Sequence, residues 1–172
     1  MKSSKILIAI ALVISPIVTF AQAQFDKFED LEGVSSVIVN KKAFSLMTKI
    51  GADSDPEYLQ LIQNIDNLKV FATENPAVGA KMEAEVKKYL QSANLEELMR
   101  VKDDGSNVNI YVKEGKTEDY VKELFMFVKD GDSKGETVII SLTGNIDLKQ
   151  ISKLTKEMNL PGGKHLEKAG DQ

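Results

Sequence analysis

The side chains that most often carry enzyme chemistry are scarce in this sequence. The chain has 172 residues, no cysteine and one histidine, His165. The lack of cysteine excludes thiol nucleophiles, disulfides and cysteine-based zinc or iron–sulfur sites. A serine mechanism would need His165 as its base, and this residue lies near the end of a glycine-flanked tail, which argues against that class. Aspartate, glutamate and lysine remain as the possible acid–base groups.

Two pairs of closely spaced carboxylates are the first candidates for acid–base chemistry. They are Asp53 with Asp55, and Asp103 with Asp104. Asp55 precedes Pro56, where an aspartate caps the start of a helix, and the second pair opens a turn. We expect both pairs to serve these structural roles. No catalytic residue is predicted, and the chain is not expected to be an enzyme.

The segment from Asp130 to Gly135 is similar to the opening of a calcium loop. Asp130 and Asp132 place side-chain oxygens at the first and third positions, as such a loop requires. Lys134 stands at the fifth position, where its charge would repel the ion, and no carboxylate follows at the distal ligand position. We therefore expect a hairpin connection here, and no metal or cofactor is predicted.

The first 23 residues have the three-part pattern of a signal peptide. Lys2 and Lys5 precede an apolar run from Ile6 to Ile14, and Ala21-Gln22-Ala23 supplies the small residues of a cleavage site. The run is too short for a membrane-spanning helix, which needs about 20 apolar residues. A retained amphipathic anchor is the alternative. We expect residues 1–23 to be removed, leaving a soluble periplasmic or extracellular protein that is not a lipoprotein and has no transmembrane segment.

The charge balance argues against a nucleic-acid partner. The chain has 22 basic and 26 acidic residues, and removal of Lys2 and Lys5 with the signal peptide would leave 20 basic residues and a net charge of −6. Arg100 is the only arginine, so the planar fork that favours phosphate and guanine recognition is almost absent. Arg100 lies in an expected strand, and we expect its side chain to be exposed because buried arginine is rare.

Hydrophobic periodicity predicts the elements of the first half of the mature chain. A short helix or docked arm is expected at 24–33, from the spacing of Phe25, Phe28 and Leu31. Strands are expected at 34–39 and 68–73. Helices are expected to begin after Asn40, at Asp55-Pro56 and at Asn75-Pro76, since these residues provide cap and first-turn chemistry.

The second half changes from a period of 3.6 to a period of 2. Four strands are expected, at 97–103, 107–113, 120–129 and 136–143, and a helix capped by Asp147 is expected to follow. The short glycine-containing connections favour antiparallel hairpins, so the four strands should form a meander. The strands at 34–39 and 68–73 could extend this meander or pair apart from it.

These elements predict an α+β fold: an antiparallel sheet with a C-terminal four-stranded meander and about four helices packed on it, in the order β-α-α-β-α-β-β-β-β-α. We expect a single domain at 24–168 and a disordered tail at 169–172. Alternation along the strands divides their side chains between two faces. One face should supply the core through Val108, Ile110, Val112, Leu124, Met126, Val128, Val138, Ile140 and Leu142.

The other face is unusually apolar for a surface that meets solvent. Phe71, Tyr111, Phe125 and Phe127, with Ile139, project to this side. We call the four aromatic residues the aromatic face. Either the two helices before Leu68 or the N-terminal arm covers it as a second core layer, or it is an exposed patch that binds a partner. We favour the covered arrangement, because monomers seldom expose large apolar patches.

Several segments resemble a known family. They are GVSSVIVNKKAFSLMTKIG, LKVFATENP, ELMRVKDDGSNVNIYVKEGK, LFMFVKDG and SLTGNIDLKQISKLTKEMNLPGGKHL. Together they are similar to the domain-of-unknown-function 4252 family of Gram-negative envelope proteins, over about residues 25–166. The resemblance implies an envelope location and carries no activity or cofactor to transfer. Some members look like lipoproteins with a cysteine at the end of the signal; the lack of cysteine here implies a freely soluble exported form.

The sequence therefore predicts an exported, non-enzymatic module that binds a protein or peptide partner in the cell envelope through the sheet or its edge. The alternative is a carrier of a hydrophobic ligand or lipid on the aromatic face. A third class is an enzyme that uses aspartate and lysine alone. A cavity above about 300 Å³ lined by the aromatic face would favour the carrier, whereas an exposed edge strand would favour protein binding.

Overall fold

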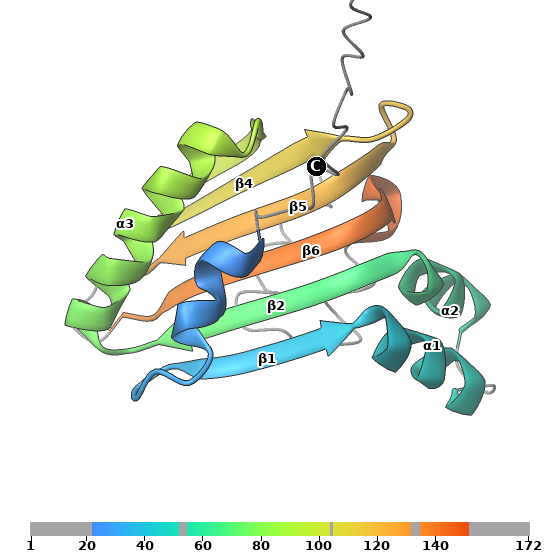
Figure 1. Cartoon of the computed structure of the whole chain (residues 1–172). Coiled ribbons are helices and arrows are strands. Elements are labelled where there is room, and N and C mark those ends of the chain that lie inside the picture. Colours follow the sequence, from blue (N-terminus) through green and yellow to red (C-terminus); the bar gives the residue numbers. More distant parts are fainter. Residues whose placement is uncertain (1–21, 52–54, 104, 132–134, 152–172) are drawn as a thin grey trace, which may run out of the picture.

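The computed structural model describes residues 22–51, 55–103, 105–131 and 135–151, and the structural statements below refer to these residues (Figure 1). In chain order, the elements are η1 (Gln22–Phe28), β1 (Ser35–Asn40), α1 (Lys41–Ile50), α2 (Pro56–Gln63), β2 (Ile65–Thr73), α3 (Pro76–Ser92), β3 (Glu96–Asp103), β4 (Ser106–Glu114), β5 (Tyr120–Lys129), β6 (Thr137–Asp147) and η2 (Leu148–Gln150). The two η elements are 3₁₀-helices.

All six strands form one antiparallel sheet in the order β1-β2-β6-β5-β4-β3. The predicted α+β class and the C-terminal meander of β3 to β6 are confirmed. The first two strands extend the meander, because β2 pairs with β6 and leaves β1 at one edge of the sheet. The other edge is β3. Val70, Ile140, Met126 and Ile110 lie side by side across four strands, so alternation places them on one face.

The helix starts lie where the cap residues predict them. The Asn40 side chain accepts a hydrogen bond from the backbone N–H of Ala43 at 3.0 Å. Asp55 caps α2, and Asn75 accepts from two N–H groups of the first turn of α3. Each cap satisfies a donor that the helix itself leaves unpaired. Asp55 thus has the structural role that its position before Pro56 predicts.

Some predictions fall outside the described residues. They concern the signal peptide up to residue 21, Asp53, Asp104, the turn at 132–134, His165, the tail at 169–172 and the C-terminal helix beyond Ile151. The beginning of that last helix is described: Asp147 accepts a hydrogen bond from the N–H of Lys149 at 2.9 Å, and η2 follows. In the described ranges, no helix has both the length and the apolar character needed to span a bilayer.

The strand β2 starts three residues before the predicted position. Ile65 pairs with Gly144, and a bulge separates that pair from the regular register that begins at Asn67. Gly144 has a φ of 151°, and a Cβ atom there would lie 2.2 Å from the carbonyl oxygen of Asn64. Only glycine allows the backbones to approach this closely.

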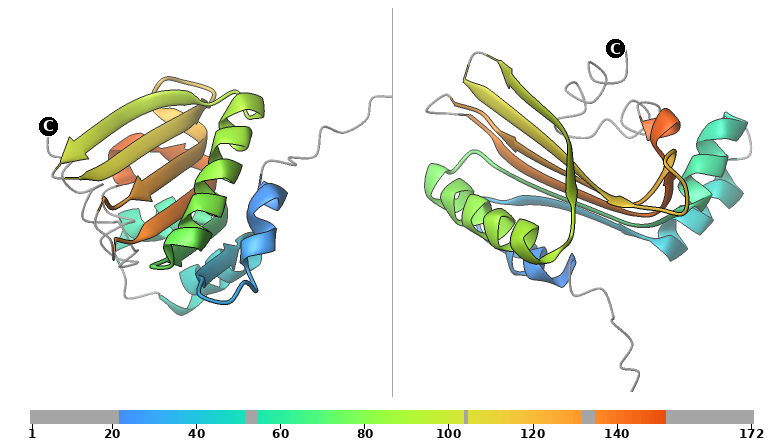
Figure 2. Two further views of the ribbon diagram at one scale, coloured as in Figure 1. Left: turned by 90° about the vertical axis from the view of Figure 1, so that its left-hand side faces the viewer. Right: turned by 90° about the horizontal axis from the view of Figure 1, so that it is seen from above.

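The sheet carries one apolar layer on each face. Figure 2 shows α3 and η1 together on one of these faces. The first layer contains Phe44 of α1 and Leu61 and Ile62 of α2, together with all nine strand residues predicted for this core. The second layer contains the aromatic residues of η1, the apolar stripe of α3 and the opposite side chains of the strands. Both faces of the sheet are therefore buried, each by different elements.

One of the predicted alternatives for the cover of the second face, the two helices before Leu68, is wrong. The helices before Leu68, α1 and α2, contribute to the first layer, whereas α3 and η1 cover the second. The reason is topological, because α3 connects β2 to β3, four positions away in the sheet. Four strand spacings amount to about 19 Å, and a helix of this length spans about 25 Å. The helix α3 can therefore cross the sheet over β6, β5 and β4.

Candidate functional site

The aromatic face lies in the second apolar layer. Phe71 and Phe125 are fully buried, Phe127 is buried and Tyr111 is partly buried. Phe125 stacks on Phe25 of η1 with ring centroids 5.5 Å apart, and it contacts Tyr89 of α3 at 5.0 Å. The predicted covering of this face is confirmed, with the N-terminal arm as part of the cover. Its role as an interaction face stays a prediction.

The arm η1 fills the space that a hydrophobic ligand would need above the aromatic face. Phe25 and Phe28 are both buried, and Phe28 lies edge-on to Phe71. The side-chain amide of Gln24 and the ammonium of Lys27 both reach Glu85 of α3, at 3.2 and 2.8 Å. Lys27, together with Lys88, lowers the pKa of Glu85 to about 2. A ligand on this face would have to displace packed rings and break these bonds.

One carboxyl group is buried within the second layer. Glu123 of β5 accepts a hydrogen bond from the hydroxyl of Tyr89 at 2.5 Å and another from Ser141 at 3.3 Å. Burial raises the pKa of Glu123 above its ordinary value, although these two donors oppose the shift, and it also raises the pKa of Tyr89. Lys113 lies directly opposite on β4. Among the residues that the structure describes, no other carboxylate is buried in this layer.

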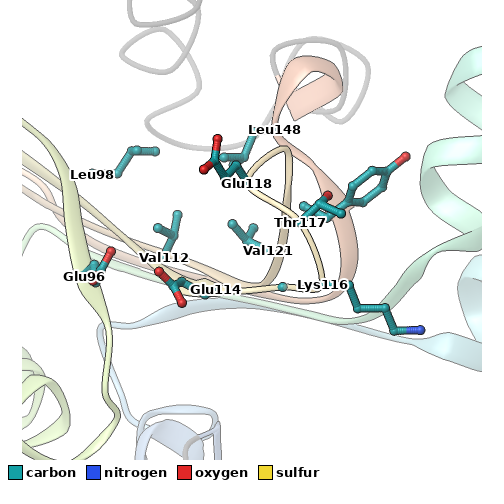
Figure 3. Close-up of a pocket in the computed structure, with 11 residues that line it drawn as sticks. Glu96, Leu98, Val112, Glu114, Lys116, Thr117, Glu118, Val121 and Leu148 are labelled. Carbon is teal, nitrogen blue, oxygen red and sulfur yellow. The ribbon is translucent and has the colours of Figure 1, made fainter.

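A surface pocket of about 400 Å³ lies at one end of the sheet, between β3 and the turn after β4 (Figure 3). Leu98, Val112, Val121 and Leu148 supply its apolar part. Glu96, Glu114 and Glu118 lie around them, and the side chain of Lys116 points away from the group. None of the residues of the aromatic face lines this pocket. Within the described ranges, no three histidine, aspartate or glutamate side chains gather as the ligands of a metal ion would.

The two edges of the sheet differ in a way that bears on partner binding. The edge strand β3 carries Glu96, Glu97, Arg100 and Lys102, and a bulge interrupts its pairing. Arg100 is exposed, as predicted, and pairs with Glu97 at 2.5 Å. Charges and bulges on an edge strand discourage pairing with another chain. The edge β3 is therefore protected.

The edge β1 has none of these protections. Its sequence Ser-Ser-Val-Ile-Val-Asn contains no charge and no proline, and its pairing with β2 is regular over all six residues. Val37 and Ile38 are 43% and 39% exposed. Its outer row of backbone groups is directed away from β2, which is the arrangement that accepts another strand.

The helix α1 adds exposed apolar surface next to this edge. Phe44 alone is buried, whereas Leu46, Met47 and Ile50 are 56%, 39% and 75% exposed. Ala43, Phe44, Met47 and Ile50 recur at helical spacing, yet Met47 and Ile50 are exposed. The helix lies at the end of the sheet beside α2 (Figure 1), and it also contacts β1 and β2.

We call β1 together with Leu46, Met47 and Ile50 the open edge. Sequence reasoning did not find these residues as a site. The available signal was the uncharged run from Ser35 to Asn40, in contrast to the charged run of β3. That contrast becomes informative only when the strand order shows that these two strands are the edges.

The comparisons with known proteins show a family for this chain. The family model described as "Domain of unknown function (DUF4252)" matches residues 28–154. No curated protein and no solved structure matches the chain. The matched range begins at Phe28 in η1 and includes all six strands, so it contains the whole sheet and the open edge.

Proposed function

The chain belongs to the family described as domain of unknown function DUF4252, and we propose that it is an exported, non-enzymatic module that binds a protein or peptide by accepting a strand at the open edge. The description of the family names no activity, so the proposal depends on the geometry of the sheet. The observation that carries it is the difference between the two edges: β3 is charged and bulged, whereas β1 is uncharged, regular and exposed.

Strand addition at β1 would combine two sources of affinity. The backbone of β1 can exchange hydrogen bonds with an extended segment, and the side chains of Val37 and Ile38 lie on opposite faces to contact alternate residues of that segment. The exposed side chains of α1 extend the apolar contact beyond the strand. Burial of such side chains contributes roughly 25 cal/mol for each Å² removed from water.

Export is supported by the N-terminal pattern of the sequence. Lys2 and Lys5, the apolar run and the small residues before Gln24 fit removal of the first 23 residues. The absence of cysteine fits a protein without a lipid anchor that folds without disulfides. The proposed setting is therefore the periplasm or the extracellular space.

The proposal predicts that a photo-crosslinking amino acid at Val37 captures a partner and that the same probe at Val101 does not. Val37 lies on β1 and Val101 on β3, and the two side chains are 43% and 37% exposed. Ile38→Lys should lower the yield from position 37 at least about tenfold, because a charge on an edge strand opposes pairing. The measurement is the yield of adduct in cells that export the protein.

Leu98→Lys on β3 is the matched control, since Leu98 is an exposed apolar residue of the other edge. It should leave the adduct at position 37 unchanged. Equal adducts from both edges would contradict the proposal. Native mass spectrometry of the gently purified protein distinguishes the carrier: a small bound molecule that is lost on denaturation, without an adduct at position 37, would favour that function instead.

A further inference from the structure

The segments on either side of β1 carry opposite charges. Glu29, Asp30 and Glu32 precede the strand and are exposed, and Lys41, Lys42 and Lys49 follow it in α1 and are exposed as well. The hydroxyl of Ser36 donates a hydrogen bond to the backbone carbonyl of Glu29 at 3.1 Å, which holds the acidic segment beside the start of the strand. The open edge therefore has an acidic end and a basic end.

Most of these charges are available to a partner. Lys41 pairs with Asp66 at 2.6 Å. In the part of the chain that the structure describes, no ion pair engages Glu29, Asp30, Glu32, Lys42 or Lys49. On β3, by contrast, Arg100 is already paired with Glu97 of the same strand.

In an antiparallel pair, the first residues of the added strand lie beside the last residues of β1, and its last residues lie beside the first residues of β1. The start of the added strand therefore faces the lysines, and its end faces the acidic residues. Electrostatic complementarity therefore selects a strand with acidic residues before it and basic residues after it. The segment of this chain from Glu29 to Lys42, EDLEGVSSVIVNKK, has this order. We propose that the strand accepted by the open edge is β1 of a second copy, so that two sheets join around a two-fold axis; this inference rests on the proposed function.

The alternation of β1 is compatible with such a pair. Directly opposed residues in an antiparallel pair project to the same face, and a two-fold axis perpendicular to the sheet keeps the faces of both copies aligned. Val37 can therefore face Val37 of the second copy, with Ser35 opposite Val39. In this register the apolar residues Val37 and Val39 line one face of the joint and Ile38 lines the other, as they do in the pairing with β2.

The experiment uses two charge-reversed variants of the chain, expressed with its N-terminal segment and purified from the cell envelope. In the first variant Glu29, Asp30 and Glu32 are changed to lysine, and in the second Lys42 and Lys49 are changed to glutamate. The readout is the dissociation constant of the dimer by sedimentation velocity. Circular dichroism checks folding, which these exposed positions should not disturb.

The unaltered protein is expected to form a dimer that weakens as salt is raised. Each variant alone should dimerise at least about tenfold more weakly, because like charges then face each other at both ends. An equimolar mixture should restore the affinity, because the acidic end of one variant then meets the basic end of the other. Ile38→Lys should abolish the dimer, and Leu98→Lys should leave it intact.

A mixture that binds no more tightly than the separate variants would overturn self-pairing. A monomeric unaltered protein would also overturn it. If position 37 still crosslinks to a different protein in that case, the proposed function stands and only the identity of the partner changes. If positions 37 and 101 crosslink equally, the proposed function itself fails.

Discussion

Replacing Phe125 with aspartate is expected to abolish folding. The Phe125 ring is fully buried and contacts Phe25 at 5.5 Å, Tyr89 at 5.0 Å and Tyr111 at 6.4 Å between ring centroids. Truncation of a buried phenylalanine costs about 3–5 kcal/mol. An aspartate would also place a charge among these rings with no partner designed for it. The sum of these two costs exceeds the free energy of unfolding of a protein at the lower end of the usual range, which is roughly 5–15 kcal/mol.

Lys122→Asp is the matched control for this prediction. It introduces the same side chain in β5, at an exposed position three residues before Phe125. The control should keep the circular dichroism spectrum and the cooperative denaturation of the unaltered protein, whereas Phe125→Asp should lose both. If Phe125→Asp folds normally and loses only the capture of a partner, the aromatic face is a binding site and not a core layer.

Tyr89→Phe is expected to destabilise the protein by up to about 3 kcal/mol at a pH where Glu123 is ionised, which is the range for a hydrogen bond to a charged group. The hydroxyl of Tyr89 donates to Glu123 at 2.5 Å in the second layer. Its removal leaves the buried carboxylate with Ser141 as the remaining donor seen here and Lys113 as the facing cation. The measurement is the free energy of unfolding in urea.

The pH dependence of this effect follows from the direction of the pKa shift. Burial raises the folded-state pKa of Glu123 above the ordinary value of 4.5. Below that value the carboxyl of Glu123 is neutral in both the folded and the unfolded state, and its contribution to the free energy of unfolding is fully present. This contribution is lost as the pH rises through the folded-state pKa. The cost of Tyr89→Phe should accordingly be smaller at about pH 4 than at about pH 8.

Glu123→Gln provides the control. Glutamine keeps an oxygen that can accept the bond from Tyr89 and does not titrate. The stability of Glu123→Gln should not decline above the ordinary glutamate pKa. When Tyr89→Phe is added to Glu123→Gln, it should lower the free energy of unfolding by less than it does alone, and by about the same amount at both pH values. A cost of Tyr89→Phe that is independent of pH, with Glu123 present, would contradict the assignment of Glu123 as the titrating group.

Local features of the fold could be predicted from single residues. Asn40, Asp55 and Asn75 start helices where their side chains can satisfy first-turn N–H groups, since cap chemistry depends only on neighbours in the sequence. The four strands of the meander follow from alternation and short glycine turns for the same reason. Their nine core residues were also correct, because a period of two fixes which side chains share a face.

Features that depend on distant partners could not be predicted in the same way. Met47 and Ile50 recur with Phe44 at helical spacing, yet these two side chains are exposed whereas Phe44 is buried. The apolar face of α1 is wider than the surface of α2 and the sheet against which it packs. The aromatic face could be recognised as apolar, but its cover by α3 depends on β2 and β3 lying four positions apart. The open edge was missed because a strand is an edge only when no other strand pairs with one of its two sides. The spacing of residues in the sequence does not show which strands these are.

The position of β6 has a consequence for when the protein can fold. This strand is the last of the six along the chain, yet it lies between β2 and β5. The β1–β2 pair and the β3–β5 group therefore have no common sheet until residues 137–147 have been synthesised. Pairings over such long sequence separations form slowly, since loop closure precedes the contacts that offset its entropy. A nascent chain built in this order cannot complete its sheet until its last strand has been made.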